Sequence, residues 1–430
     1  AMALVGNAFL PDGWAAFHAA PFGHWPHAPP PTDFLWSKAC HTAGEALPVS
    51  YSGEDALEML KAADPSVVDL KLDGASLGEE VLQCFSMSLG ENQSLRTLRI
   101  EMIGLGPQGA ALIAKALESN RSLTSLSLPY TGIGAQGASA LAGVLSQGSS
   151  LTSLDLSGNT LGPAGVGHIA DALANNCELV ELSLALNCVG RVGVGKIVDA
   201  LRSNRNLRLL DLSNNNLRLE GAVLLAEALG DPACPLTSLV LADNKLGAAG
   251  IQRLASALVR NATLTSLGLA SNGGGDACME SIAEAVVAND WLTSLDLSMN
   301  SVSLHGVDQL LVALDHNTTL TEINLRNNVV PIARLLAVEE KISMNRLVRV
   351  FTVWCEHLDQ DTLSISCVNL NGETKAALEV CTSEAFATTR ARIAALLEVD
   401  DATLRLALPS GVLVEDPTNK ATAAELLLEL

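Results

Sequence analysis

The chain has 430 residues, of which 48% are hydrophobic and only 3% aromatic, so any core must be built from aliphatic side chains. Its formal net charge of −21 argues against nucleic acid or an anionic membrane surface as a partner, because both need clustered Lys and Arg. The 9 cysteines have no paired spacing, which favours a reducing intracellular compartment, in the simplest case the cytoplasm, with import into an organelle still open.

Two further features bear on localisation. No apolar run reaches the roughly 18 residues that a membrane-spanning helix needs. No basic residue precedes Lys38, so the beginning of the chain does not suit a secretory signal. We therefore expect neither a membrane span nor secretion.

Residues 1–50 form an arm that is rich in proline and aromatic residues. Proline at this density disfavours regular helix or sheet, yet large aromatic rings are costly to leave in water. The arm can serve as a cap over the end of the following domain or as a partner-binding segment. Its stretch HAAPFGHWPH contains three histidines but no Cys or carboxylate, so we expect no metal site there. The candidate contact residues are Trp14, Phe17, Phe22, Trp25, Phe34 and Trp36.

A series of repeats follows the arm. Each repeat predicts a short strand, a turn and then an amphipathic helix, such as the one marked by Val166, Ile169, Ala170 and Leu173. No single unit can bury its leucines alone, so the units must stack. The pattern L-x-x-L-x-L, or a close variant, recurs every 28 residues with one spacing of 29, beginning at Val67, Leu95, Leu123, Leu151, Leu179, Leu207, Leu236, Leu264, Leu292 and Leu320.

An asparagine follows the strand in seven of these repeats. A buried Asn side chain in a turn can bond backbone groups that would otherwise lack a partner. Because the residues share one repeat position, we expect them to form a ladder along the array. They are Asn159, Asn187, Asn215, Asn244, Asn272, Asn300 and Asn328.

This pattern resembles the ribonuclease-inhibitor type of leucine-rich repeat, which is also found in the sensor ends of NOD-like receptors and in Ran GTPase-activating proteins. The resemblance covers about residues 67–350. It implies an α/β solenoid of about ten 28-residue repeats, with parallel strands on the concave face and helices on the convex face. We expect the solenoid and its caps to occupy residues 51–355.

One stretch of the repeats also matches a nucleotide-binding motif. Gly190, Gly195 and Lys196 spell G-x-x-x-x-G-K, the beginning of a phosphate-binding P-loop. Ile197 stands where that motif needs Ser or Thr, and it aligns with the core residue Ile169 of the preceding repeat. We therefore expect a repeat turn and helix here, with no nucleotide and no other cofactor.

Four N-glycosylation sequons share a repeat position as well. They fall in the turn from helix to strand, where Asn and Ser have local turn chemistry. We interpret them as turn residues rather than as signs of secretion. They begin at Asn92, Asn120, Asn261 and Asn317.

The positions between the core leucines are expected to face the concave side, since side chains alternate along a strand. Most are small or acidic, which predicts a weakly negative trough. Interface hot spots favour large side chains and Arg, so the candidate anchors are Arg99, Met102, Tyr130 and Leu186, with Lys71 nearby. The alternative is that these are ordinary surface residues. The trough residues are Ser125, Ser127, Ser153, Asp155, Glu181, Ser183, Asp211, Asp243, Ser266, Asp296 and Glu322.

The repeat period ends near residue 350, and residues 346–358 are expected to close the array. Residues 360–430 then predict a hairpin at Asn371-Gly372, an amphipathic helix and short strands. This order resembles the β-grasp fold of ubiquitin, with the final "ELLLEL" as the last strand. The chain ends without a diglycine, so we expect a docking module rather than a conjugated one.

These features predict a non-enzymatic protein-interaction scaffold or adaptor, and a fixed subunit of a larger complex is one form that it could take. The alternative, which the resemblance to Ran GTPase-activating proteins implies, is a GTPase regulator that uses the turn residues Arg191 and Arg218. Neither a catalytic triad nor a metal-ligand spacing is present in the sequence. The expected partners are proteins of unknown identity.

Overall fold

The structure is a computed structural model that describes residues 50–62, 66–73, 78–347, 350–357, 362–368, 374–381, 383, 386–397, 405–407 and 413–414. Two sheets are found in these residues, one with 11 strands and one with 5. The expected N-terminal arm, including Trp14, Phe17, Phe22, Trp25, Phe34 and Trp36, lies outside the described residues.

Parallel strands stack in sequence order to form the larger sheet, one strand per repeat. Strands β2 to β11 belong to the ten expected repeats, and β1 adds a strand before the first of them. The predicted leucine-rich-repeat solenoid is therefore confirmed. The strands are β1 (Ser50–Tyr51), β2 (Asp69–Asp73), β3 (Thr97–Glu101), β4 (Ser125–Ser127), β5 (Ser153–Asp155), β6 (Glu181–Ser183), β7 (Leu209–Asp211), β8 (Ser238–Val240), β9 (Ser266–Gly268), β10 (Ser294–Asp296) and β11 (Glu322–Asn324).

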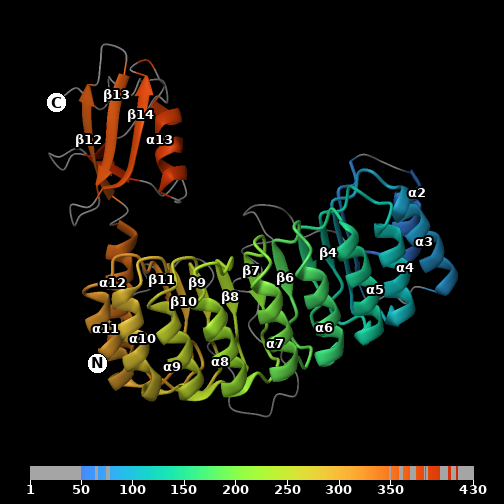
Figure 1. The fold of residues 1–430 in the computed structure, drawn as a ribbon, viewed down its shortest axis with the longest axis horizontal. Helices are drawn as coiled ribbons and strands as arrows, with labels where there is room; N and C mark the ends of the chain where they lie inside the picture. The colour runs from blue at the N-terminus through green and yellow to red at the C-terminus, as the bar shows by residue number, and fades with distance from the viewer. Residues whose placement is uncertain are drawn as a thin grey trace, which may run out of the picture. The chain divides into compact units, whose positions relative to one another are not determined.

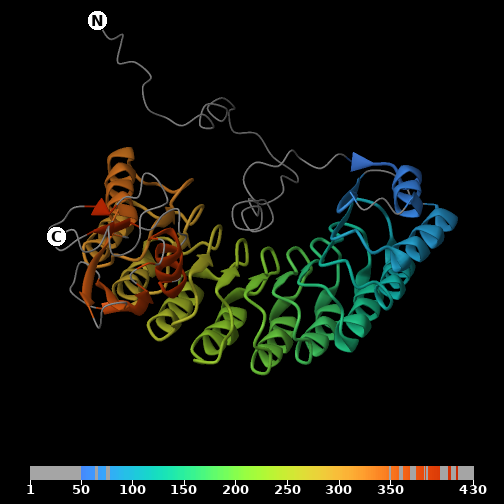
Figure 2. The same ribbon diagram turned by 90° about the horizontal axis from the view of Figure 1, so that it is seen from above.

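Helices alternate with these strands (Figure 1). Within the array the sheet lies on the inner side of an arc and the helices on its outer side (Figure 2). A short 3-10 helix at Asp276–Cys278 replaces the first turn of the helix in one repeat. The helices are α2 (Gly53–Ala62), α3 (Glu79–Glu91), α4 (Gly106–Leu117), α5 (Gly134–Gln147), α6 (Gly162–Leu173), α7 (Gly190–Leu201), α8 (Arg218–Leu229), α9 (Gly247–Leu258), α10 (Met279–Ala288), α11 (Leu304–Leu314) and α12 (Ile332–Leu347).

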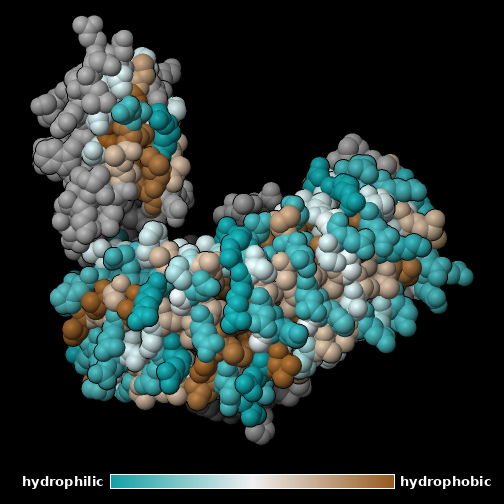
Figure 3. Space-filling view, in the orientation of Figure 1, coloured by the Kyte–Doolittle hydropathy of each residue, from teal (hydrophilic) through white to brown (hydrophobic). Residues whose placement is uncertain are grey.

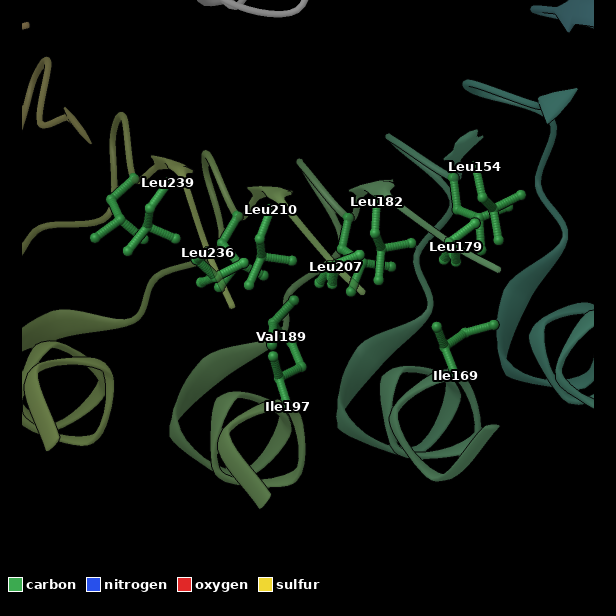
Figure 4. Close-up of a cluster of buried hydrophobic side chains, with 14 of the residues drawn as sticks. Leu154, Ile169, Leu179, Leu182, Val189, Ile197, Leu207, Leu210, Leu236 and Leu239 are labelled. Atoms are coloured by element: carbon green, nitrogen blue, oxygen red, sulfur yellow. The ribbon is translucent and has the colours of Figure 1, made fainter. Parts of the chain in front are cut away.

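The core lies between the sheet and the helices and is continuous from repeat to repeat. The register places the same leucine of each repeat beside the next, for example Leu154 beside Leu182 and Leu182 beside Leu210. Figure 4 shows these leucines above helix residues such as Ile169 and Ile197. Full burial of one such side chain stabilises the fold by about 2 kcal/mol. Each repeat therefore depends on its two neighbours for its stability.

The turn from strand to helix contains up to three residues in the left-handed conformation, at alternate positions. Glycine suits such a residue because it has no Cβ to approach the carbonyl oxygen. Arg218 is the exception at the third position, with a φ of 58°. The glycines at this third position are Gly106, Gly134, Gly162, Gly190, Gly247 and Gly275.

The smaller sheet has the strand order β14-β13-β12-β15-β16. Its first strand, β12, pairs antiparallel with β13 and parallel with β15, so it is the central strand. The expectation that residues 346–358 close the array is therefore wrong, and the boundary expected at 355–360 falls after the first strand of this sheet. The elements are β12 (Val350–His357), β13 (Thr362–Val368), β14 (Thr374–Cys381), α13 (Phe386–Leu396), β15 (Arg405–Ala407) and β16 (Leu413–Val414).

The predicted hairpin is present, since β13 and β14 pair antiparallel and α13 follows them. The "ELLLEL" segment lies outside the described residues. The ubiquitin-like resemblance of residues 360–430 stays a prediction. In the described part of the chain, no helix has both the length and the apolar composition that crossing a membrane requires.

Candidate protein-binding surface

One row of polar side chains crosses the inner face of the array, because the parallel register aligns equivalent positions. Cations stand at its beginning and carboxylates further along. The row reads Lys71, Arg99, Ser127, Asp155, Ser183 and Asp211, and it ends with Asp296 and Asn324.

The expected acidic trough is not open to solvent at this row. Asp155 and Asp211 are only 5% and 3% exposed, and Asp296 is buried as well. Asp155 accepts hydrogen bonds from the Ser127 hydroxyl at 2.9 Å and from both the backbone N–H and the hydroxyl of Ser157. The flanking strands and turns thus supply the donors that water would supply at an open surface.

Asp211 is the most deeply perturbed of these carboxyls. Burial raises its pKa to about 6, and the nearby Asp155 carboxylate acts in the same direction. Hydrogen bonds from the backbone N–H and hydroxyl of Ser213, at 2.8 and 2.6 Å, act against this rise. Part of the inner face is therefore less negative than its composition indicates.

An ion cluster lies at the N-terminal end of the row. The Glu101 carboxylate is 3.0 Å from Nε of Arg99 and 3.8 Å from Nζ of Lys71. All three side chains are partly buried, so solvent screens these pairs less than it screens pairs on an open surface. The cluster holds the Arg99 guanidinium on Glu101, the residue that precedes Met102 in the chain.

Met102, Tyr130 and Leu186 occupy one repeat position at the edge of the inner face. Each is the first left-handed residue of its turn, with φ between 55° and 58°. Met102 is 66% exposed and Tyr130 is 42% exposed, while Leu186 is half-buried. Their backbone N–H groups donate to the next repeat, as from Tyr130 to the Ser157 carbonyl at 2.9 Å. The fixed backbone holds these apolar side chains toward solvent.

Asp243 shares this position, although the sequence pattern assigned it to a strand. It has a φ of 50° and accepts a hydrogen bond from Nδ2 of Asn214 at 3.0 Å. It therefore lies on the edge of the inner face and not within the strand row.

The environment of Tyr130 combines apolar and acidic neighbours. Partial burial raises the pKa of its hydroxyl, and the carboxylates of Asp155 and Glu101 raise it further. The hydroxyl therefore stays protonated near neutral pH and is available as a hydrogen-bond donor. A partner can thus meet a methionine, a tyrosine ring and a phenolic donor on neighbouring turns.

The seven asparagines of the strand-to-helix turn lie in a ladder. The backbone N–H of each donates to Oδ1 of the next, at 2.9 to 3.0 Å from Asn159 through Asn328. The Nδ2 atoms donate to strand carbonyls, as from Asn215 to the Leu184 carbonyl at 2.8 Å. Each asparagine thus bridges adjacent repeats and keeps the turns in register.

A second row of asparagines lies at the helix-to-strand turns and includes all four sequons. Asn120, which is 1% exposed, donates from Nδ2 to the carbonyls of Leu89 and Asn92 at 2.7 and 3.0 Å. Its Oδ1 accepts from the backbone of Ser122 and Leu123. The interpretation of these sites as turn residues is confirmed. The buried members of the row are Asn92, Asn120, Asn176, Asn204, Asn261, Asn289 and Asn317, and Asn345 occupies the equivalent repeat position within α12.

The G-x-x-x-x-G-K match forms the first turns of α7 rather than a phosphate loop. Ile197 is buried and points into the core with Val189, below the strand leucines (Figure 4). Lys196 is exposed on the helix. The absence of a nucleotide stays a prediction.

The two arginines that a GTPase regulator would use are both exposed. Arg191 is the second residue of α7, and Arg218 is the first residue of α8. Nε of Arg218 donates to Oδ1 of Asn216 at 3.3 Å. Among the described residues, no three His, Cys, Asp or Glu side chains are grouped so that they could hold a metal ion.

A parallel sheet with one strand, one asparagine-bonded turn and one helix per repeat defines the class of leucine-rich-repeat solenoids. The Leucine Rich repeat family model matches residues 119–142, 149–170, 203–226 and 233–255. The chain is a leucine-rich-repeat protein with ribonuclease-inhibitor-like repeats. No curated protein sequence matches it significantly.

Similar solved structures include a leucine-rich repeat-containing protein, LegL7 from Legionella pneumophila, with 18% identity over 69% of this chain and 98% of that one and a TM-score of 0.45. Leiomodin-1 Actin-Binding Site 2 is 20% identical over 39% of this chain and 80% of its own, with a TM-score of 0.25. The Caenorhabditis elegans tropomodulin C-terminal domain is 11% identical over 42% and 92%, with a TM-score of 0.28.

Three features of the surface were missed from the sequence. Burial of Asp155 and Asp211 depends on donors from other repeats, which no local pattern reveals. The ion cluster of Lys71, Arg99 and Glu101 was also missed. Arg99 and Glu101 are two residues apart, and Lys71 lies one repeat before Arg99, so the 28-residue register could have indicated the cluster. The left-handed conformation of Arg218 could have been found by alignment with Gly190.

Proposed function

We propose that the chain is a non-catalytic protein-interaction scaffold that contacts its partner through Met102, Tyr130 and the adjoining ion cluster. The observation that carries this proposal is the exposure of Met102 and Tyr130 on backbone that the neighbouring repeat holds in place. Apolar side chains fixed in this way lose little conformational entropy when a partner covers them. Each such anchor contributes on the order of 2 kcal/mol to an interface.

The polar surroundings support a partner that carries both apolar and charged groups. Arg99 and Lys71 hold the Glu101 carboxylate and bring two positive charges to this end of the inner face. The Tyr130 hydroxyl adds a neutral donor. We propose an apolar contact at the centre of this surface and hydrogen bonds at its edge, which is the usual composition of specific interfaces.

The test is a quantitative capture experiment from cells that contain the protein. Partners recovered with the wild-type chain are compared with those recovered with a Met102→Ser/Tyr130→Ser variant. The matched control is Val259→Ser/Val312→Ser, because these valines are as exposed but lie at the end of α9 and on α11.

The proposal predicts that a partner is lost from the first variant and retained by the control. Retention by both variants, with both proteins folded, would show that this surface does not bind. A partner recovered in fixed stoichiometry would favour the form in which the chain is a permanent subunit.

The N-terminal arm is a second part of the proposal, and its aromatic content supports it. If residues 1–45 bind a partner, their deletion abolishes capture while the unfolding temperature is unchanged. If they cap the array, the deletion lowers the unfolding temperature by several degrees. Unchanged capture together with unchanged stability would exclude both roles.

A GTPase regulator is the alternative function, and the exposure of Arg191 and Arg218 in adjacent repeats is what favours it. Any GTPase among the captured partners is assayed for GTP hydrolysis with wild-type protein and with Arg191→Ala and Arg218→Ala. Loss of stimulated turnover without loss of binding would favour the regulator over the scaffold.

A further inference from the structure

The repeat that begins with α7 is basic in an otherwise acidic protein. Residues 190–218 contain six Arg and Lys residues against two Asp, whereas the whole chain carries a net charge of −21. One of the two carboxyls is Asp211, which is buried in the inner face. The outer surface of this repeat is therefore more positive than its composition alone indicates.

Three of these six cations make an ion pair or bond backbone carbonyls, and Arg218 makes one hydrogen bond, to Oδ1 of Asn216. Arg202 pairs with Asp199 at 2.6 Å. Arg205 and Arg208 donate to backbone carbonyls, among them those of Ala233 and Pro235 in the next repeat. The cations left over are Arg191, Lys196 and Arg218, and the next repeat adds Lys245; none of these four has an ion pair among the described residues.

Three of these cations share the strand-to-helix side of the array. The backbone N–H of Arg218 donates to the Asn244 carbonyl at 2.9 Å, which places Arg218 beside Lys245. The N–H of Gly190, next to Arg191, donates to the Asn215 carbonyl at 3.1 Å and so connects Arg191 to the same turn. We call Arg191, Arg218 and Lys245 the cationic edge. It lies on consecutive repeats, which bring the three charges together.

Two exposed apolar side chains adjoin the cationic edge. Val192 is 67% exposed and Leu219 is 40% exposed, and each directly follows an arginine of the edge. Figure 3 shows a strongly hydrophilic column over the region of β7 and α8, with hydrophobic patches close by. Glu220 is the acidic residue next to Leu219, and Asp243 is engaged by Asn214. Three cations therefore face two carboxylates, because the neutral amide of Asn214 leaves the charge of Asp243 in place.

Arg218 also has a backbone conformation that glycine occupies in the equivalent turns. A side chain is strained there, and unfavourable backbone conformations of this kind concentrate at functional sites. Arg218 is exposed, and its side chain makes one hydrogen bond, from Nε to Oδ1 of Asn216 at 3.3 Å. The other N–H groups of the guanidinium remain available to a ligand.

We infer that the cationic edge, with Val192 and Leu219, is a docking site for an acidic protein segment that carries aliphatic side chains. Carboxylates of the segment pair with the cations, and its leucine-like side chains cover the two apolar residues. The overall negative charge of the chain disfavours nucleic acid and anionic membranes, whose high charge density would be repelled beyond this small area. The inference rests on the scaffold function but not on the Met102 and Tyr130 surface.

The test is a fluorescence-anisotropy titration of the full chain with a labelled peptide that alternates Asp or Glu with Leu. The variant Arg191→Gln/Arg218→Gln/Lys245→Gln is expected to weaken binding about tenfold. The control Lys115→Gln/Arg253→Gln/Arg260→Gln removes the same charge from exposed positions on α4, on α9 and in the turn after α9, and is expected to change affinity less than about twofold. Unfolding temperatures verify that each variant is folded.

Three results would overturn the inference. The first is that the wild-type chain does not bind the peptide, and the second is that both triple variants bind it equally weakly. The third is that a single-stranded oligonucleotide or anionic vesicles displace the peptide as readily as unlabelled peptide does. The Met102→Ser/Tyr130→Ser variant is expected to bind the peptide normally. Failure of the scaffold surface and failure of the cationic edge are therefore distinguished.

Discussion

The ring of Tyr130 lies over Gly158, the residue at the equivalent position of the next repeat. A Cβ added to Gly158 would lie 2.5 Å from Cδ1 of Tyr130, much closer than two carbon atoms can approach. Gly158 also has a φ of 68°. The glycine therefore allows both the left-handed turn and the position of the ring.

We predict that Gly158→Ala destabilises the array by about 2 kcal/mol, because it adds a steric conflict to left-handed strain. Gly162→Ala is the control, since Gly162 has a φ of 60° but open space around it, and about 1 kcal/mol is expected there. Urea unfolding measures both. In the double variant Tyr130→Ala/Gly158→Ala the ring is gone, so the extra destabilisation of Gly158→Ala over Gly162→Ala should disappear. If the free-energy changes of the two single substitutions simply add in the double variant, the contact between ring and Cβ is contradicted.

Asn215 is a central member of the ladder, and we predict that Asn215→Ala costs about 3 kcal/mol. The substitution leaves the N–H groups of Asn187 and Val189 without their acceptor and removes the Nδ2 donor from the Leu184 carbonyl. Asn328→Ala should cost less, since Asn328 is half-exposed and water can replace its bonds. Hydrogen exchange should accelerate at the amides of Asn187 and Val189. Equal costs at the two positions would argue against burial as the cause.

Asp211 makes stability depend on pH in a defined window. Its pKa is about 6 in the folded chain, against an ordinary value of 3.8, so the folded state binds the proton more tightly. Stability therefore falls as pH rises from about 4 to about 6, by on the order of 2 kcal/mol. In Asp211→Asn this contribution is absent. Unfolding free energies of the two proteins measured across this range test the sign, and parallel curves would contradict it.

Arg218→Gly is predicted to stabilise the array by up to about 1 kcal/mol, because it removes a side chain from a left-handed residue. Arg191→Gly is the control. Arg191 lies inside α7, where glycine weakens the helix by a similar amount. The unfolding temperature should therefore rise in Arg218→Gly and fall in Arg191→Gly. A lower unfolding temperature for Arg218→Gly would mean that the arginine makes a stabilising contact.

The strand β12 makes a prediction about fragments of the C-terminal sheet. Residues 346–430 should fold alone and give dispersed amide resonances, because they include the central strand. Residues 360–430 should remain unfolded, since β13 and β15 lose the strand that joins them and keep only β14 and β16 as neighbours. If the shorter fragment folds cooperatively, β12 is dispensable to the sheet.

The array was predictable because its information is local and repeated. A leucine pattern with a 28-residue period defines strand, turn and helix in every unit, and one mistaken unit cannot shift the others. Ile197 shows the gain from this: its place in the period identified it as a core residue despite the P-loop match.

The unpredicted features depend on contacts between distant parts of the chain. The central place of β12 arises from its pairing with β15, more than 40 residues later, for which the sequence has no periodic signal. The candidate anchors Met102 and Tyr130 could be named from residue type and position. The burial of Asp155 and Asp211 could not, because it depends on side chains that four repeats bring together.

The buried asparagines of the helix-to-strand turns have a consequence for biosynthesis. Nδ2 of Asn120 is the atom to which an oligosaccharide would be joined, and in the folded chain two backbone carbonyls occupy its hydrogens. If the chain entered a compartment with glycosyltransferases, folding and sugar transfer would compete for this atom. A single early transfer would leave the affected repeat unable to stack on its neighbour. The protein would then be a substrate for quality control instead of a glycoprotein.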